Sequence, residues 1–247
     1  MFGLFSKSKS KSSKFDFSQL GTDMHSHLLP GIDDGAKDVA ASVEYIRGMH
    51  QLGYNKFITT PHIMWDMYRN TPAIIQQRLE VVKAELKKED LPVEINAAAE
   101  YFLDEHVEDL LKRKEKLLTI SENKVLVEFS MAFPSMNIKD ILFEMQMQGY
   151  QPIIAHPERY IYLQKNKEFY SELKDIGCMF QLNILSLTGH YGKSVNELAQ
   201  WLIKNEFYDL VGTDLHHHGH LEGLEHFQAG ATLSQLVDSG RIINKQL

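Results

Sequence analysis

Histidines and carboxylates recur at the ends of short β-rich runs in this chain of 247 residues. The first run ends in His25-Ser26-His27, and on a strand both imidazoles of such a pair point to the same side because side chains alternate with a period of two. Asp214 and His216 have the same spacing near the last run. The strand-end candidates are His25, His27, His62, Glu100, Glu128, His156, Asp214 and His216.

These side chains are candidate metal ligands. A single strand-end histidine is more often a hydrogen-bonded structural residue, but the whole set carries a stronger signal. Several carboxylates and imidazoles in one pocket would be costly to bury without cations, because like charges repel one another and buried charges lose their hydration. Imidazole and carboxylate groups are ligands that divalent metals accept. The set therefore predicts a cluster of divalent metals.

The loop after the first run contains Asp33-Asp34-Gly35, which could simply be a turn that leads into a helix near Asp38. We take Asp34 as a ligand candidate and Asp33 as a structural residue, although periodicity alone does not make that choice.

Arg159 follows His156 by three residues. Such an arginine can hold two phosphate oxygens at once. The alternative is an ion pair with Glu158 or another surface acid.

The remaining histidines and the one cysteine are predicted to have no role in the chemistry. In the run from His216 to His220 only His216 has a strand-end position, so the other histidines of the run are expected to be exposed. Cys178 is expected to be a buried strand residue, because cysteine-based phosphatases require an arginine six positions later and Ile184 stands there. Surface or hydrogen-bonded positions are expected for His50, His106, His190 and His226.

Seven β-rich runs alternate with segments of helical period. The strands are expected at Thr22–His27, Lys56–Thr60, Val93–Ala99, Lys124–Glu128, Gln151–Ala155, Met179–Asn183 and Leu210–Gly212. The helices are expected at Val39–Leu52, from Pro72 through Leu86, and at Asn137–Gln148, Lys167–Ile176 and Val195–Lys204. Strict alternation predicts a parallel sheet, and seven units without a Gly-rich phosphate loop favour a closed or nearly closed barrel. An open sheet is the alternative. In a barrel the strand ends converge on the catalytic face.

Length and composition indicate one globular domain at 21–247, since an α/β barrel takes about 250 residues. Residues 1–20 differ in composition from the rest of the chain, because lysines alternate with serines between phenylalanines. This pattern predicts a flexible basic arm. The alternative is a segment that attracts anionic lipid or an acidic partner. The net charge of −7 argues against nucleic acid as a partner. One cysteine and the absence of an apolar run of about 20 residues favour the cytoplasm.

The chain resembles the polymerase and histidinol phosphatase (PHP) superfamily, and within it the bacterial protein-tyrosine phosphatases of capsule and exopolysaccharide operons. The resemblance covers about 22–220. Asp34, Glu128 and the Glu-Arg-Tyr after His156 are closer to the tyrosine-phosphatase branch than to the histidinol-phosphatase or polymerase-associated branches. The motifs that carry it are Asp23-Met24-His25-Ser26-His27, Asp33-Asp34-Gly35, Thr60-Pro61-His62, Ala99-Glu100-Tyr101, Val127-Glu128-Phe129-Ser130, Ala155 to Tyr160 and Thr213-Asp214-Leu215-His216.

The resemblance implies a distorted seven-stranded (β/α)7 TIM-like barrel and a site for three divalent metals, commonly Mn²⁺, with Fe, Zn or Mg as alternatives. One metal would be held by His25, His27, Glu100 and Asp214. Glu100 would bridge to a second, held also by Glu128 and His156. A third would be held by Asp34, His62 and His216.

The implied activity is hydrolysis of phosphotyrosine by a metal-activated hydroxide, with a bacterial tyrosine kinase tail as the protein substrate. Catalytic roles are expected for Arg159, Glu100 and His62. The alternatives are a small-molecule phosphatase of the histidinol-phosphate type, a 3′–5′ exonuclease, which the net charge disfavours, and a non-catalytic regulatory module. The complete ligand set argues against the last of these.

Overall fold

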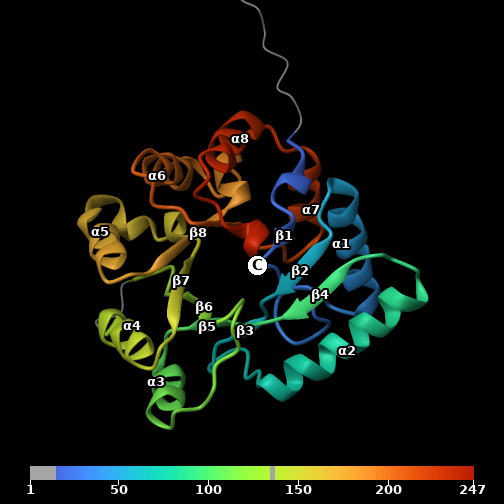
Figure 1. Cartoon of the computed structure of the whole chain (residues 1–247), viewed down its shortest axis with the longest axis horizontal. Coiled ribbons are helices and arrows are strands. Elements are labelled where there is room, and N and C mark those ends of the chain that lie inside the picture. The colour runs from blue at the N-terminus through green and yellow to red at the C-terminus, as the bar shows by residue number, and fades with distance from the viewer. Residues whose placement is uncertain (1–14, 134–136) are drawn as a thin grey trace, which may run out of the picture.

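The computed structural model describes residues 15–133 and 137–247, and within them nine parallel-paired strands lie at the centre of eight α-helices (Figure 1). One sheet has the order β1-β2-β4 and the other the order β3-β5-β6-β7-β8-β9. The strands are β1 (Thr22–Asp23), β2 (Lys56–Thr59), β3 (His62–Ile63), β4 (Glu94–Ala97), β5 (Glu100–Phe102), β6 (Lys124–Glu128), β7 (Gln151–Ala155), β8 (Met179–Asn183) and β9 (Leu210–Gly212).

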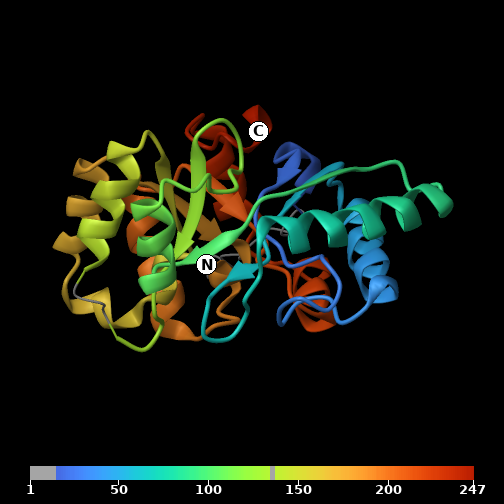
Figure 2. The ribbon, with the colours of Figure 1, turned by 90° about the horizontal axis from the view of Figure 1, so that it is seen from below.

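The helices cover the outside of the strands. Both views place α1 and α2 on one side and α3, α4 and α5 on the opposite side (Figures 1 and 2). No helix of the described residues combines the length and the apolar character that crossing a bilayer requires. The α-helices are α1 (Val39–Leu52), α2 (Pro72–Lys88), α3 (Glu105–Lys112), α4 (Ile138–Met147), α5 (Glu168–Asp175), α6 (Lys193–Lys204), α7 (His218–Glu225) and α8 (Gly230–Asp238). Short 3-10 helices are η1 (Phe17–Gln19), η2 (Pro157–Arg159), η3 (Ile161–Lys165), η4 (Ile184–Thr188) and η5 (Asn244–Gln246).

The two long N-terminal helices begin where their capping residues predict. The Asp38 carboxylate accepts a hydrogen bond from Ala41 N at 2.8 Å and begins α1. Thr71 caps α2, and Pro72 occupies its first turn, where a missing N–H breaks no helical hydrogen bond. The apolar stripe Ile75, Leu79, Val82 and Leu86 is buried, as its spacing predicts.

The number of strands differs from the seven expected. The second and third expected strands end early as β2 and β4, and after an interruption each is followed by a further short strand, β3 or β5, in the other sheet. Pro61 lies at the first interruption and has no N–H to donate to a ladder. The structure is therefore an α/β fold with two parallel sheets, and the interruptions change the positions of two candidate ligands. His62 begins β3 and Glu100 begins β5, whereas both were expected after strand ends.

Backbone hydrogen bonds join the segments that follow β1 and β9. His25 O accepts from Asp214 N at 2.7 Å, and His27 N donates to Leu215 O at 2.9 Å. At the opposite end of these strands, the buried Asn244 side chain donates to Thr22 O at 3.0 Å and to Val211 O at 2.6 Å. The first and last strands are thus fastened at both ends, although β1 pairs only with β2.

The expected helices are present within two residues of their predicted ends, but α3, α7 and α8 were not expected. These three have eight or nine residues each, so their apolar pattern is short. Cys178 is buried as expected, although it precedes β8 rather than lying in it.

The boundary predicted for the basic arm is wrong at its C-terminal end. Phe15, Phe17 and Leu20 are buried in the main hydrophobic core. The ring of Phe17 lies 5.1 Å from that of Phe15, 5.6 Å from that of Tyr54 and 5.8 Å from that of Phe227. The four lysines of the arm, Lys7, Lys9, Lys11 and Lys14, lie outside the described residues.

We expect Phe17→Ala to lower the free energy of unfolding by about 3–5 kcal/mol, because it removes a buried aromatic ring and leaves a cavity. Urea denaturation with an unchanged m-value measures this loss. The exposed Phe143→Ala on α4 is the control and should change stability by less than about 0.5 kcal/mol. A loss of similarly small size for Phe17→Ala would mean that the segment before β1 is not part of the folded core.

Candidate metal centre

The nine candidate ligands converge in one place. One group consists of His25, Glu100, His156 and Asp214, all of them buried, and their ligand atoms lie within 4.8 Å of one another. The same limit holds for His27, Asp34, His62 and His216, and for His62, Glu100 and Glu128. These groups differ from the ligand sets that the resemblance implies, because His27 is grouped with Asp34, and His156 is grouped with His25.

Glu100 connects the groups. Its Oε2 atom lies 3.2 Å from His25 Nε2 and 3.2 Å from His62 Nδ1, while Oε1 lies 3.1 Å from His156 Nε2. The register of the strands explains the placement, since His62 of β3 pairs directly with Glu100 of β5. A buried carboxylate whose two oxygens face different imidazoles has the geometry of a bridge between two cations.

Two of the candidate ligands have strained backbone conformations. His156 directly follows β7 with φ of 35°, and Asp214 follows β9 by two residues with φ of 51°. Left-handed conformations of non-glycine residues cost about 1–3 kcal/mol each and persist only where the surroundings hold them. The bond from Asp214 N to His25 O is one such restraint. At His156 the backbone N–H donates to Gln181 Oε1 at 3.2 Å.

The imidazoles are oriented by hydrogen bonds from the nitrogen that faces away from the centre. His25 Nδ1 donates to Gln181 Oε1 at 2.8 Å, and His27 Nδ1 donates to Asp33 Oδ2 at 2.9 Å. His216 Nδ1 donates to the carbonyl oxygen of Asp214 at 2.9 Å. In each case Nε2 is left for the centre, which is the usual arrangement around a ligating histidine.

Asp33 has the structural role that we expected for it. Its buried carboxylate also accepts from Gly35 N at 3.0 Å and His62 N at 3.2 Å. Although burial opposes ionisation, the charge of His27 lowers the pKa of Asp33 to about 2. Asp34 instead points outward, with 53 % of its side chain exposed, and its Oδ1 lies 3.5 Å from Nε2 of both His62 and His216.

The electrostatics of the centre require positive charge. Burial alone would lower the pKa of His25, but the carboxylates of Glu100 and Asp214 outweigh it and raise the pKa to about 10. Conversely, despite burial, the charge of His25 holds the pKa of both Glu100 and Asp214 well below the usual range. Protons on imidazoles and divalent metals are two ways to neutralise the same carboxylates.

The residues fit divalent metals. His62 Nδ1 is buried and lies 2.9 Å from Glu128 Oε1, yet the two atoms do not have the angles of a hydrogen bond. A nitrogen aimed at a carboxylate without such a bond suits a cation shared between them. The full set of imidazole nitrogens and carboxylate oxygens is of the kind that Mn²⁺, Fe²⁺ and Zn²⁺ accept.

Comparison with known proteins identifies the family. Residues 21–223 match the family model described as "Capsular polysaccharide synthesis, CpsB/CapC". The chain belongs to the CpsB/CapC family.

Relatives in this family carry phosphatase names. The chain is 33% identical over 196 residues to the tyrosine-protein phosphatase YwqE of Bacillus subtilis, covering 78% of this chain and 76% of YwqE. It is 29% identical over 200 residues to the tyrosine-protein phosphatase CpsB of Streptococcus agalactiae, covering 78% and 82% of the two chains.

Solved structures agree with this assignment. Crystal structures of YwqE from Bacillus subtilis and CpsB from Streptococcus pneumoniae, described as unique metal-dependent tyrosine phosphatases, include a chain that matches with a TM-score of 0.75. The identity is 28%, and the match covers 88% of this chain and 92% of that chain. A lactonase from Listeria monocytogenes has the same kind of fold, with a TM-score of 0.54 at 13% identity and coverage of 93% and 89%.

In this CpsB/CapC chain Arg159 lies at the edge of the centre. Its Nη1 atom donates to Asp214 Oδ2 at 2.7 Å, and its guanidinium lies 4.5 Å from the centroid of the Tyr191 ring. The alternative of an ion pair with Glu158 is wrong. Glu158 is fully buried and accepts from Asn183 N, Ser186 Oγ and Tyr208 OH at 2.8–2.9 Å.

Several residues that support the centre were not found from the sequence. Gln181 and Asn183 lie two apart on β8, and Asn183 Nδ2 donates to Asp214 Oδ2 at 3.0 Å. Two amides on one face of an otherwise apolar strand are a signal that could have indicated them. Tyr191 was also missed, because it lies in a loop.

His220 was predicted to be exposed, and that prediction is wrong. It is buried because α7 begins at His218 and turns this side chain back toward the centre. Burial lowers the pKa of His220 to about 4, so the ring is neutral and its Nδ1 accepts a hydrogen bond from His216 N at 3.2 Å. His217 and His218 are exposed as predicted.

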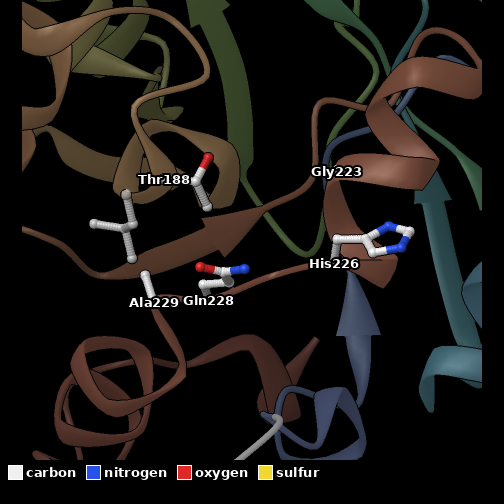
Figure 3. A pocket seen from close by; sticks show the side chains of 6 residues that line it. Thr188, Gly223, His226, Gln228 and Ala229 are labelled. Carbon is white, nitrogen blue, oxygen red and sulfur yellow. The ribbon is translucent and has the colours of Figure 1, made fainter. Parts of the chain in front are cut away.

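Two hollows differ in what they could bind. The one over the metal centre has a volume of 360 Å³, and apolar side chains such as Met64, Met67 and Phe102 surround its ligands. Figure 3 shows the other, at Thr188, Gly223, His226, Gln228 and Ala229, which shares no residue with the centre and has no carboxylate among its described lining residues. The first hollow is therefore the candidate active site.

We expect Glu100→Gln to weaken the binding of at least one Mn²⁺ by about tenfold or more, since even outer-shell partners of metal ligands contribute 10–100-fold to affinity. Calorimetric titration of metal-stripped protein with Mn²⁺ gives the stoichiometry and affinity, and elemental analysis checks the stripping. The matched control is Glu168→Gln on the exposed side of α5. Unchanged stoichiometry and affinity in Glu100→Gln would exclude Glu100 as a bridging ligand.

Proposed function

We propose that this protein is a metal-dependent protein-tyrosine phosphatase of capsule or exopolysaccharide synthesis. The observation that carries the proposal is the convergence of four carboxylates, five imidazoles and Arg159 beneath one hollow with an apolar rim. The names of its relatives support the same activity, because YwqE and CpsB are both called tyrosine-protein phosphatases.

The charge of the site suits a phosphate dianion. Three divalent cations would bring +6 to the four carboxylates Asp34, Glu100, Glu128 and Asp214, which leaves a balance of +2 before Arg159 is counted. When bound, such metals supply Lewis acidity, which lowers the pKa of water toward ~7 and offsets phosphoryl charge. The residues that would hold them are the nine of the candidate centre.

Arg159 is placed to stabilise the phosphoryl group. Asp214 and the ring of Tyr191 restrain the guanidinium, while 26 % of the side chain stays exposed and lines the hollow. A restrained cation needs little reorganisation when negative charge develops on the transferring oxygens. Asp214 Oδ2 is occupied by Arg159 and Asn183, which leaves Oδ1 for the centre, 3.2 Å from His25 Nε2.

The rim favours an aromatic leaving group. Met64, Met67, Phe102 and Met131 line the hollow, and Tyr68 stacks on His62 with ring centroids 5.5 Å apart. An apolar rim gains by covering a phenyl ring and gives little to the charged amine of histidinol phosphate. A phenolate has a conjugate acid of pKa ~10, so its departure does not require a strong general acid.

Finer parts of the proposal rest on the sequence and on the resemblance. They are that the metals are three Mn²⁺ ions, that residues 21–247 form one domain together with the buried Phe15, Phe17 and Leu20, and that the substrate is the tail of a bacterial tyrosine kinase controlling polysaccharide export. We place the protein in the cytoplasm, with peripheral membrane association through the basic segment of residues 1–14.

The test of the function is a substrate panel with Mn²⁺-loaded protein. We expect kcat/KM for a phosphotyrosine peptide to exceed that for the matched phosphoserine peptide and for histidinol phosphate by at least about tenfold, which corresponds to 1.4 kcal/mol. The phosphoserine alkoxide is the poorer leaving group. Equal efficiencies, or a preference for histidinol phosphate, would overturn the tyrosine-phosphatase assignment and leave the metal centre in place.

We expect Arg159→Ala to lower kcat/KM by an amount equivalent to about 2–4 kcal/mol, because it removes a charged contact to the transition state. Its Mn²⁺ content should be unchanged, since Asn183 still holds Asp214. The control is Arg78→Ala on the exposed face of α2, which should keep full activity. A parallel loss of Mn²⁺ in Arg159→Ala would show that Arg159 acts by positioning Asp214.

A further inference from the structure

A second, larger groove opens beside the hollow over the metal centre. Its volume is 730 Å³, against 360 Å³ for the hollow, and both are lined by Met64, Phe102, Phe129 and Ser130. A molecule bound at the centre can therefore continue into the groove without leaving the surface. The metal mechanism uses none of the residues that are unique to the groove.

One wall of the groove is a fixed aromatic surface. The rings of Trp65 and His106 stack with centroids 3.7 Å apart and an interplanar angle of 11°. The Asp104 carboxylate anchors both sides of the stack, because it accepts from Trp65 N at 3.1 Å and from Val107 N at the start of α3 at 3.1 Å. The wall is thus formed before any ligand arrives, which reduces the ordering that binding requires.

The charge of the groove is opposite to that of the metal centre. Asp66, Asp104, Glu105 and Asp109 line it, and its described lining residues include no lysine or arginine. Lys112 Nζ lies 3.6 Å from Asp109 Oδ1, but both side chains are exposed, so a ligand cation can compete with this pair. The nearby Arg69 is not among the described lining residues; it donates to Trp65 O at 2.9 Å, and its guanidinium lies 5.9 Å from the centroid of the Trp65 ring. Burial lowers the pKa of His106, so its ring adds no positive charge at neutral pH.

We propose that the groove binds the polypeptide that flanks the phosphotyrosine and selects substrates with a lysine or arginine close to it. This inference rests on the proposed function. The aromatic wall would cover the aliphatic part of the long cationic side chain, and the exposed carboxylates of Asp66 and Asp109 would face its charge. An extended chain advances about 3.3 Å per residue, so the selected position lies within about four residues of the phosphotyrosine.

The experiment uses phosphotyrosine peptides that differ only by lysine or glutamate at each position within about four residues of the phosphotyrosine. With Mn²⁺-loaded protein, at least one position should show kcat/KM about three- to tenfold higher for lysine, as expected for one or two exposed charge pairs. The preference should shrink as salt is raised, since exposed charges are screened. A small aryl phosphate, which cannot reach the groove, serves as the reference substrate.

Matched variants separate the groove from general electrostatics. Asp66→Asn combined with Asp109→Asn should abolish the lysine preference and leave hydrolysis of the aryl phosphate unchanged. The control combines Glu80→Gln on α2 with Glu197→Gln on α6, two exposed residues whose loss changes the net charge equally, and it should keep the preference. All four sites are on the surface, and melting temperatures check that each variant is folded.

The outcomes distinguish the two proposals. If lysine and glutamate peptides are hydrolysed equally well at every position while the aryl phosphate is a good substrate, the groove proposal fails and the phosphatase assignment stands. If the control variant also lost the lysine preference, that preference would come from the overall charge of the protein. This outcome would also overturn the groove proposal. Failure to hydrolyse any phosphotyrosine substrate or aryl phosphate would remove the proposed function and the groove proposal together.

Discussion

Carboxylates buried within a few ångströms of one another must be neutralised, and the arrangement around Glu100 follows from that constraint. Glu100 and Asp214 share one group of ligand atoms, and Glu100 and Glu128 share another. Without nearby positive charge their mutual repulsion and lost hydration would oppose folding. Imidazoles surround them, and the shifted pKa values of His25, Glu100 and Asp214 are the signature of that compensation.

Holding such a cluster places demands on the neighbouring strands. Gln181 and Asn183 are polar at positions of β8 where apolar side chains could have packed, and both form hydrogen bonds to candidate ligands. Asp23, buried at the end of β1, accepts hydrogen bonds from the backbone and the hydroxyl of Thr213, and burial raises its pKa to about 6. The left-handed backbone of Asp214 begins directly after this contact. The strain at the centre is therefore held by polar contacts at the ends of the strands on both sides.

The sequence predicted the composition of the site better than the path of the chain through it. The cap at Asp38 and the buried stripe of α2 are local patterns, and the structure confirms both. Residue type also selected the side chains that the fold brings together, although His62 and Glu100 begin strands instead of following strand ends. The interruptions before His62 and Glu100 depend on which strands pair with each other. The alternation of residue types along the chain does not predict this pairing. The burial of Phe17 depends likewise on Tyr54 and Phe227, which are distant in the sequence. His220 was misjudged because an eight-residue helix gives little periodicity.

The Asn244 contact has a consequence for synthesis on the ribosome. Thr22 O, at the start of the strand that leads to His25, is bonded by a side chain 222 residues later. Asp214, which fixes the backbone of His25, also emerges long after the first strand. Contacts with so large a sequence separation form slowly and only once both partners are available. The first two histidines are therefore incompletely held during most of translation, and the metal binding that we propose would be completed only near the end of synthesis.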